Sequence, residues 1–219
     1  KPIYETENQF SKRDGSLECI MNEAIDETGA KYVAMCEGDD YWTDSLKLQK
    51  QVDFMEVNLE YSICFHKVNT LIQTSGVVRD EFLVRNMPEK STILDLAEGN
   101  YIHTPSVVYR RDLLSFDKVK LLLPCLPFDY VVWMLLAEKG PIFKINEYMA
   151  IYRYGTGFWE SSSVMKRHAL TLCTLSKLSV VLQTYQTILK KQIKRIQEEL
   201  WHIIRIKDSD SIMVRQSCA

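Results

Sequence analysis

The sequence predicts an α/β fold in which a mixed sheet is flanked by helices and followed by a helical C-terminal region. Within residues 1–160, short apolar runs alternate with segments whose apolar residues recur at helical spacing. Two later extended runs are separated only by a short polar turn, which indicates antiparallel pairing. Residues 161–219 carry no strand signal and few helix breakers. We therefore expect an α/β domain over residues 1–160 and a helical region over residues 161–219.

The first expected elements are an extended piece, a helix and a strand. Residues 1–4 are short and extended, whereas residues 13–27 carry apolar side chains at helical spacing. Gly29 ends that helix. Residues 32–36 form an apolar run bounded by polar turns, which is typical of a strand buried on both faces.

A second helix and a hairpin follow. The helix has its N-cap at Thr43 or Asp44 and runs to about residue 57. Its inward residues are expected to be Leu46, Val52, Phe54 and Met55. Residues 61–72 and 77–84 are extended and flank the turn Thr74-Ser75-Gly76, which predicts a hairpin.

Most of the remaining elements before the C-terminal helices are short and are bounded by glycine, proline or a polar turn. They are a short helix over residues 95–98 closed by Gly99, a β-rich segment at 105–110, a moderately helical segment at 112–123, an apolar helix at 130–139 ended by Gly140-Pro141, two strands at 142–145 and 149–154, and two long C-terminal helices that meet near residues 187–190.

The composition excludes several classes of protein. Hydrophobic residues make up 46% of the chain, charged residues 26%, and the net charge is −2, so the basic excess typical of nucleic-acid binding is absent. No apolar run approaches the roughly 18 residues of a membrane-spanning helix. The six cysteines form no Cys-x-x-Cys pair. They predict reduced, packed thiols in a cytoplasmic protein, without a disulfide frame or a zinc site.

The most informative local feature is the acidic turn Glu37-Gly38-Asp39-Asp40, directly after the strand expected at residues 32–36. Carboxylates a few ångströms apart repel each other by about 1–4 kcal/mol at effective dielectrics of roughly 80 to 20. A hard divalent cation, Mg²⁺ or Mn²⁺, removes that repulsion. Ligands of open α/β sheets also bind beyond the carboxyl ends of the strands. From these residues alone, a solvated acidic turn is an equal alternative.

The acidic turn lies within a longer motif. An apolar strand, a Gly-Asp-Asp-Tyr-Trp turn and a Lys-Leu-Gln-Lys-Gln helix follow one another within residues 32–52. Further matching segments are residues 100–106, Asp129 with its helix, and residues 149–153. Together they closely resemble family-2 glycosyltransferases of the GT-A fold, in particular bacterial enzymes of surface-polysaccharide assembly. The resemblance covers roughly residues 1–160 and implies a GT-A-like, Rossmann-like sheet.

The resemblance implies roles for the polar residues of this motif. Asp40 is expected to be the metal ligand, with Mn²⁺ or Mg²⁺ bridging the two phosphates of a nucleotide-sugar donor. Asp39 is also part of the expected metal site and is expected to hold the ribose or an outer-shell water. Glu37 is expected to lie outside the direct ligands of the metal. Trp42 could stack on a sugar ring; the alternative is that it packs at the sheet edge, as aromatic residues in such positions more often do. Arg153 is a candidate phosphate contact, against a structural ion pair.

A second carboxylate supplies the other part of the expected chemistry. Inverting sugar transfer needs a base that takes the proton of the acceptor hydroxyl. The resemblance implies that Asp129 is this base. Without the resemblance, the residue type and its position favour Asp129 as the N-cap of the helix over residues 130–139. The chain departs from the pattern at two positions. Phe128 stands where many relatives have a glycine, and Gly155 stands where they often have a histidine that completes the metal shell.

The C-terminal region adds a basic amphipathic segment within residues 190–207. Such a helix binds an anionic membrane surface, where lipid-linked acceptors reside, or packs on the first domain or on another subunit, the commoner arrangement. The expected partners are a nucleotide-sugar donor, with a UDP-sugar favoured, and a saccharide or lipid-linked acceptor. Peripheral membrane contact and homodimerisation through the C-terminal helices are both open. The expected location is the cytoplasm, with the inner face of the membrane as an option.

The predicted function is therefore that of an inverting, metal-dependent glycosyltransferase of the hexosyltransferase type. A nucleotidyltransferase is disfavoured because the sequence has no Gly-rich phosphate loop. A catalytically silent nucleotide-sugar-binding or interaction fragment stays open, because Gly155 offers no ligand. Enzymes that resemble the chain begin with strands that hold the nucleoside, and these are expected to precede Lys1. Residues 32–36 would then form an open sheet edge, and nucleotide binding would be weak and indifferent to the base.

Overall fold

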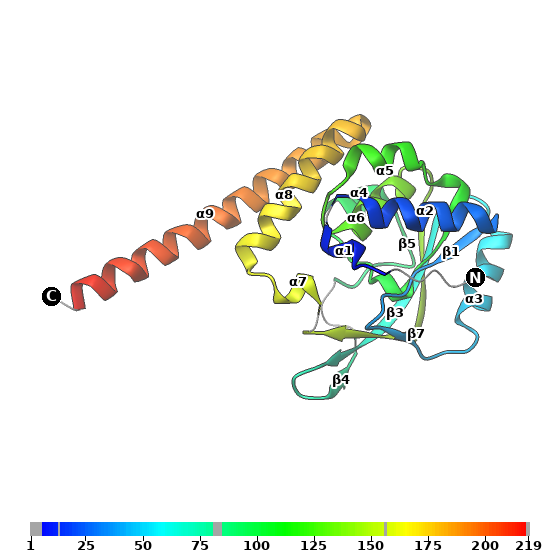
Figure 1. Cartoon of the computed structure of the whole chain (residues 1–219), viewed down its shortest axis with the longest axis horizontal. Coiled ribbons are helices and arrows are strands. Elements are labelled where there is room, and N and C mark those ends of the chain that lie inside the picture. The colour runs from blue at the N-terminus through cyan, green and yellow to red at the C-terminus, as the bar shows by residue number, and fades with distance from the viewer. Residues whose placement is uncertain (1–5, 13, 81–84, 156, 218–219) are drawn as a thin grey trace.

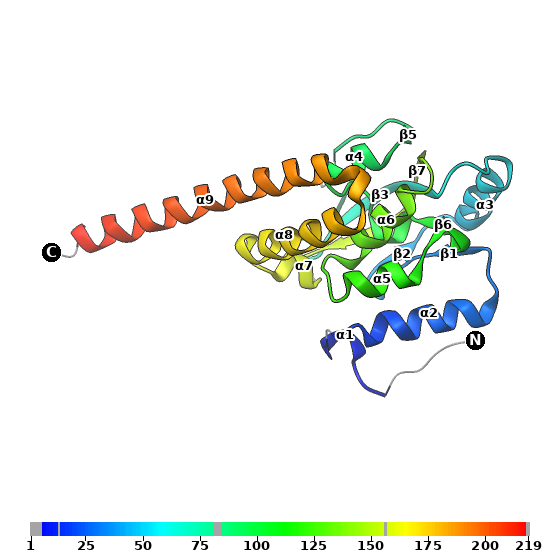
Figure 2. The ribbon, with the colours of Figure 1, turned by 90° about the horizontal axis from the view of Figure 1, so that it is seen from above.

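The computed structural model describes residues 6–12, 14–80, 85–155 and 157–217. The chain forms an α/β body from which the last helix projects, as two perpendicular views agree (Figure 1, Figure 2). The predicted mixed sheet flanked by helices and the predicted helical C-terminal region are confirmed. The extended piece expected at residues 1–4 and the last part of the expected strand at 77–84 lie outside the described residues.

Helices make up the larger share of the described chain. The α-helices are α1 (Gln9–Lys12), α2 (Ser16–Thr28), α3 (Lys47–Val57), α4 (Ile93–Ala97), α5 (Phe116–Leu122), α6 (Phe128–Ala137), α7 (Phe158–Ser161), α8 (Val164–Val181) and α9 (Gln186–Ser217). Short 3₁₀ turns are η1 (Thr104–Ser106), η2 (Arg111–Leu113) and η3 (Gln183–Tyr185). None of these helices is both long enough and apolar enough to cross a membrane.

The strands form one seven-stranded mixed sheet. They are β1 (Tyr32–Ala34), β2 (Tyr41–Trp42), β3 (Ile63–Ile72), β4 (Val77–Arg79), β5 (Lys90–Ser91), β6 (Val108–Arg110) and β7 (Ile142–Tyr154). Along the main path the order is β1, β6, β3, β7, β2, while β4 pairs with β3 and β5 pairs with β7. Only β3 and β7 run parallel; the other described pairings are antiparallel.

The core lies between this sheet and the helices that cover it. Helix α6 is apolar on nearly all sides, and every residue from Tyr130 to Ala137 is buried, as expected for a helix enclosed by other elements. Helices α4, α5 and strand β3 all contact it. The first turn of α6 is less buried than the rest of the helix. Asp129, in that turn, is therefore partly exposed at the edge of the core.

Two strand predictions are wrong in their details. The strand expected over residues 32–36 to be buried on both faces is the three-residue edge strand β1, in which only Val33 is buried. Among the described strands β1 pairs with β6 alone, so its other edge is not paired with a described strand. The two strands expected at 142–145 and 149–154 are one strand, β7, because β3 pairs along its length with register shifts around Lys67.

Three helix predictions also need correction. Helix α3 begins at Lys47 with Leu46 as its N-cap, so the N-cap predicted at Thr43 or Asp44 is wrong. The Asp44 carboxylate instead accepts the Leu46 backbone N–H at 2.7 Å in the turn before the helix. Leu46 was expected to face inward, but it precedes the helix and is 57% exposed. The C-terminal helices meet at η3, a few residues before the expected junction, because α8 ends at Val181 and Leu182 is not helical.

The expectation of packed thiols holds for only some of the cysteines. Cys64 and Cys125 are buried and Cys19 is partly buried, but Cys36 and Cys173 are exposed. These five are free thiols, and Cys218 lies outside the described residues. No disulfide joins any two of the described cysteines.

His66 is a buried, neutral histidine at the centre of β3. Its Nδ1 lies 2.7 Å from the Lys67 carbonyl oxygen, and its Nε2 has no hydrogen-bond partner in the described part of the chain. Burial lowers the pKa of His66 to about 3, against the opposing effect of the Lys67 carbonyl. His66 therefore stays neutral in the folded protein at pH values below 6.5, where the histidine of the unfolded chain binds a proton.

We expect His66 to make the fold acid-sensitive. Because its pKa is lower in the folded state, the unfolded chain binds more protons between about pH 6.5 and pH 3, and stability falls as the pH falls. Its contribution is about 1.4 kcal/mol per pH unit within that window. Urea unfolding at several pH values should show that His66→Leu loses this slope, whereas His202→Leu, on the exposed face of α9, keeps it. Parallel pH profiles for the parent and His66→Leu would contradict the assignment.

Candidate functional site

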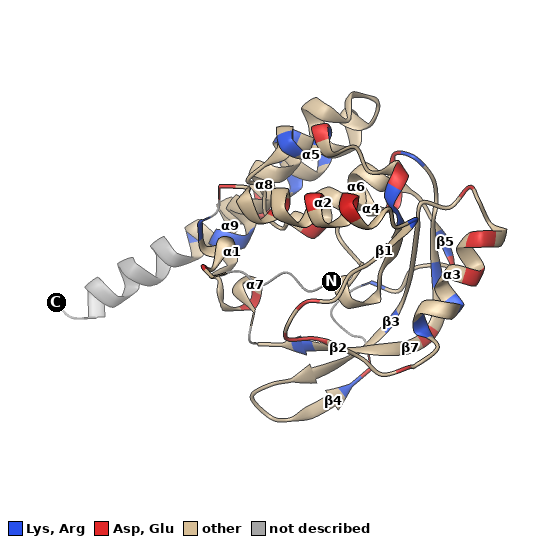
Figure 3. Ribbon diagram, turned by 45° about the vertical axis from the view of Figure 1, so that its right-hand side comes forward, with Lys and Arg blue, Asp and Glu red and all other residues tan. Residues whose placement is uncertain are grey.

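The acidic turn joins β1 to β2 at the end of the sheet. The Asp40 backbone N–H donates to the Glu37 carbonyl at 3.1 Å, which closes the turn. One carboxylate oxygen from each of Glu37, Asp39 and Asp40 lies within 4.8 Å of the others. In Figure 3 the loop entering β2 carries acidic segments and lies near the short helix α7. The turn therefore presents its carboxylates as a cluster.

Asp40 is fixed in place by the neighbouring strand. Its Oδ1 accepts the Arg153 backbone N–H at 2.8 Å, and its Oδ2 is buried without a hydrogen-bond partner among the described residues. Burial raises the pKa of Asp40 to about 6, the Arg153 N–H opposes this, and repulsion from Asp39 and Glu160 adds to it. Since buried polar atoms are nearly always satisfied, the orphaned oxygen is unusual.

Glu37 shows how crowded the negative charge is. More than a third of the residue is exposed, yet partial burial of its carboxyl group raises its pKa to about 8. The next largest cause is repulsion from Asp129, followed by Asp40 and Asp39. The charge resides on the carboxyl group, which is the crowded end of the side chain. The Asp129 carboxyl group therefore lies within electrostatic range of Glu37.

Asp129 lies in the first turn of α6 and is half-buried. The N-cap of α6 is Pro127, so the alternative that Asp129 is the N-cap is wrong. The Asp129 Oδ2 instead accepts a hydrogen bond from the Asn100 amide at 3.2 Å. Burial raises the pKa of Asp129 to about 6, opposed by the Tyr130 backbone N–H and by Asn100. The carboxylate is thus a stronger base than an ordinary aspartate.

Trp42 is anchored on one side and open on another. Its indole Nε1 donates to the Pro105 carbonyl at 3.0 Å, and the Lys47 ammonium lies 4.3 Å from the ring centroid. The residue remains 36% exposed. Lys47 is itself buried, and burial lowers its pKa to about 8. Packing of Trp42 at the sheet edge is therefore observed, while its role toward a sugar stays a prediction.

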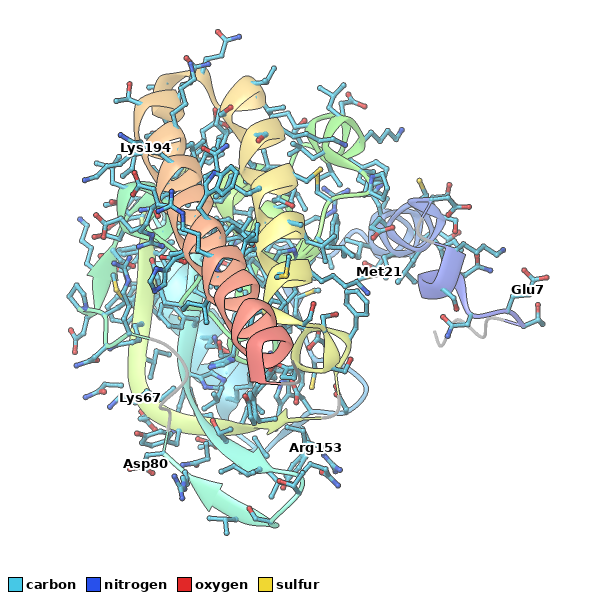
Figure 4. All side chains as sticks on the ribbon, turned by 90° about the vertical axis from the view of Figure 1, so that its left-hand side faces the viewer. Glu7, Met21, Lys67, Asp80, Arg153 and Lys194 are labelled. Atoms are coloured by element: carbon cyan, nitrogen blue, oxygen red, sulfur yellow. The ribbon has the colours of Figure 1, made fainter. Side chains whose placement is uncertain are left out.

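Arg153 contributes its backbone to the acidic turn. Its guanidinium carbon lies 5.7 Å from the Tyr41 ring centroid, and no ion pair of Arg153 is found within the described residues. Figure 4 shows Arg153 near the end of β7, below α7 in that view. Its charge lowers the pKa of Asp40, so the side chain lies close enough to the turn to affect an anion there.

Two residues near the turn were missed by the sequence reasoning. The Tyr152 hydroxyl donates a short hydrogen bond to Glu160 Oε1, and Glu160 contributes to the raised pKa values of both Glu37 and Asp40. The Tyr152 ring also lies 4.5 Å from the ring of His103, centroid to centroid. No local pattern marks Glu160, because it is the folding of α7 toward β2 and β7 that brings it to the site.

No protein-family model matches the chain. Uncharacterized proteins of Mycobacterium bovis and of two Mycobacterium tuberculosis strains are 37% identical to it over 138 residues, which is 63% of this chain. The match covers 39% of each relative, so the chain spans about two fifths of their length.

A solved structure with some likeness is that of S. aureus TarS, residues 1–349, in complex with UDP-GlcNAc. The TM-score is 0.48, the sequence identity is 14%, and the superposition covers 72% of this chain and 45% of TarS.

Proposed function

We propose that the chain is the catalytic part of an inverting glycosyltransferase that moves a hexose-type sugar from a nucleoside-diphosphate donor to a hydroxyl acceptor, in polysaccharide assembly. The observation that carries this proposal is the meeting of two carboxylate groups from distant parts of the chain. The acidic turn before β2 and Asp129 in α6 lie close enough for Asp129 to raise the pKa of Glu37. Such a reaction needs a base near the acceptor hydroxyl and a positive charge near the leaving diphosphate, which carboxylates can provide by binding a cation.

The acidic turn fits a hard divalent cation. Its donors are carboxylate oxygens within 4.8 Å of one another, and Asp40 Oδ2 is a buried oxygen without a partner in the described structure. Asp40 and Asp39 would hold the cation, with Glu37 in the outer shell. A bound Mg²⁺ or Mn²⁺ would stabilise the negative charge that develops on the departing nucleoside diphosphate.

Asp129 is the group that receives the proton. The acceptor oxygen forms a bond to the anomeric carbon of the sugar as the bond from that carbon to the diphosphate oxygen breaks. The hydroxyl proton passes to the Asp129 carboxylate, and the donor leaves as a nucleoside diphosphate. A single displacement inverts the configuration at the anomeric carbon. Asn100 orients the carboxylate through its 3.2 Å hydrogen bond, and a pKa near 6 leaves it ionised at neutral pH.

The remaining assignments follow from this arrangement. The open part of Trp42 would contact the sugar, and Arg153 would contact a donor phosphate, since its charge already acts on Asp40. A UDP-sugar is the favoured donor, and a saccharide or a lipid-linked saccharide the favoured acceptor. Helix α9, which projects from the body, is the surface for a membrane or for a second copy of the chain (Figure 1). A cytoplasmic location belongs to this proposal.

A donor panel tests the function directly. The protein is incubated with UDP-, GDP- and dTDP-sugars and a mixed saccharide acceptor, with Mn²⁺ or with EDTA, and released nucleoside diphosphate is counted. We expect release from a donor that depends on both acceptor and Mn²⁺. Mn²⁺-dependent nucleotide binding without release from any donor would instead support the catalytically silent alternative. An undiminished rate in EDTA would contradict the metal-dependent mechanism.

A further inference from the structure

Helix α7 brings a fourth carboxylate to the acidic turn, and the following inference about it rests on the proposed function. Gly155, which follows β7, has φ of 102°, a conformation that side-chain-bearing residues rarely adopt. Position 155 therefore supplies no side-chain ligand, and Glu160 is the nearest acidic residue after it in the chain.

Glu160 is tied to the strand segment that holds Asp40. Strands β2 and β7 pair with Tyr41 opposite Ile151, so Asp40 and Tyr152 follow as the next facing positions. The backbone N–H of Arg153 donates to Asp40, and the hydroxyl of the preceding Tyr152 donates to Glu160. Two consecutive residues of β7 thus hold one carboxylate of the turn and one carboxylate of α7.

Gly157 provides the space that Glu160 occupies. A β-carbon built on Gly157 would lie 2.7 Å from Glu160 Oε2, closer than real contacts allow. The backbone of Gly157 has φ of −73°, so alanine is compatible with its conformation. The obstacle is therefore only the end of a flexible side chain. A methyl group at position 157 should displace the Glu160 carboxylate without disturbing the helix.

The charge of Glu160 acts on two carboxyl groups of the acidic turn. It contributes to the raised pKa values of both Glu37 and Asp40, and within the described residues Glu160 makes no ion pair with a lysine or arginine. It is not among the carboxylates that converge within 4.8 Å, namely Glu37, Asp39 and Asp40. Its position therefore suits a water on a bound cation better than a direct metal bond. Mg²⁺ in particular keeps several waters in protein sites.

We propose that Glu160 is a positioning residue of the cation site, which holds a cation-bound water on the α7 side while the Tyr152 hydroxyl fixes its carboxylate. Outer-shell carboxylates of this kind orient the inner ligands and strengthen metal binding.

The test is a titration of the nucleotide-free protein with Mn²⁺, in which electron paramagnetic resonance measures the free Mn²⁺ and so gives the affinity. Glu160→Gln should weaken Mn²⁺ binding by about 10–100-fold, the usual effect of removing an outer-shell partner. Gly157→Ala, which keeps the charge but moves it, should give a smaller loss in the same direction. Tyr152→Phe should also weaken binding, because the carboxylate loses its donor. Glu23→Gln, on the exposed face of α2, removes one negative charge elsewhere and serves as control.

The outcomes separate this inference from the function on which it rests. If Asp40→Asn abolishes Mn²⁺ binding but Glu160→Gln and Gly157→Ala bind like the parent, the role of Glu160 is wrong and the cation site stands. If Glu160→Gln and Glu23→Gln weaken binding equally, the effect is one of net charge and the inference is overturned. If the parent protein itself binds no Mn²⁺, the cation site fails and the inference fails with it.

Discussion

Replacing Asp129 by asparagine is expected to lower sugar transfer by about 10²–10⁴-fold, the usual contribution of a general base. The amide is isosteric and can still face the Asn100 side chain, but it cannot accept the acceptor proton. Pro127, not Asp129, is the N-cap of α6, and the asparagine side-chain oxygen can still accept a hydrogen bond from the Tyr130 backbone N–H. Unfolding by urea should therefore give nearly the parent stability, while steady-state nucleotide release with acceptor should collapse.

A matched control for this substitution is Asp117→Asn. Asp117 lies in the first turn of α5, as Asp129 lies in the first turn of α6, but it is exposed and away from the acidic turn. Its variant should retain parent turnover. The parent rate should also fall as the pH is lowered through about 6, because the folded-state pKa of Asp129 lies there and the protonated form cannot act as a base. Near-parent turnover in Asp129→Asn would remove this residue from the mechanism.

The second large effect is expected from Asp40→Asn, which should weaken Mn²⁺ binding by at least about 100-fold, beyond the usual loss for outer-shell residues. Asparagine keeps an oxygen for the Arg153 N–H but loses the anionic charge, and it puts an amide where the orphaned oxygen was. In metal-free buffer the variant should melt at or above the parent temperature, because a buried, repelled carboxylate has been removed.

Addition of Mn²⁺ distinguishes this from a structural role. The parent should gain thermal stability with Mn²⁺, since a ligand that binds only the folded state stabilises it. Asp40→Asn should not respond, whereas Asp53→Asn, on the exposed face of α3, should respond like the parent. An Asp40→Asn protein with the full Mn²⁺ response would show that the acidic turn is not the metal site.

Elements with strong local signals were predictable from the sequence. The helix ended by Gly29 is α2, and Gly29 adopts the left-handed conformation that glycine favours. The hairpin around Gly76 is the β3–β4 pair. Pairing partners, in contrast, are set by the whole sheet. The apolar run of residues 32–36 does not reveal that only Tyr32–Ala34 form a strand and that only Val33 is buried, and β7 does not reveal that β3 pairs along its length.

The site divides in the same way. Glu37, Asp39 and Asp40 are adjacent in sequence, so their clustering is nearly dictated by the chain. Their proximity to Asp129 was implied only by the resemblance. Glu160 was invisible, because its approach depends on the β2–β7 register, on the Tyr152 hydroxyl and on the space left at Gly157.

The central claim is that the acidic turn binds the diphosphate of a nucleotide-sugar donor through a divalent cation. Isothermal titration calorimetry of UDP into the protein, with Mn²⁺ and again with EDTA, tests it most directly. The account predicts measurable UDP binding with Mn²⁺ and a loss of at least about tenfold in affinity with EDTA, since the carboxylates alone repel the phosphates. UDP binding of equal affinity in Mn²⁺ and in EDTA would contradict the claim.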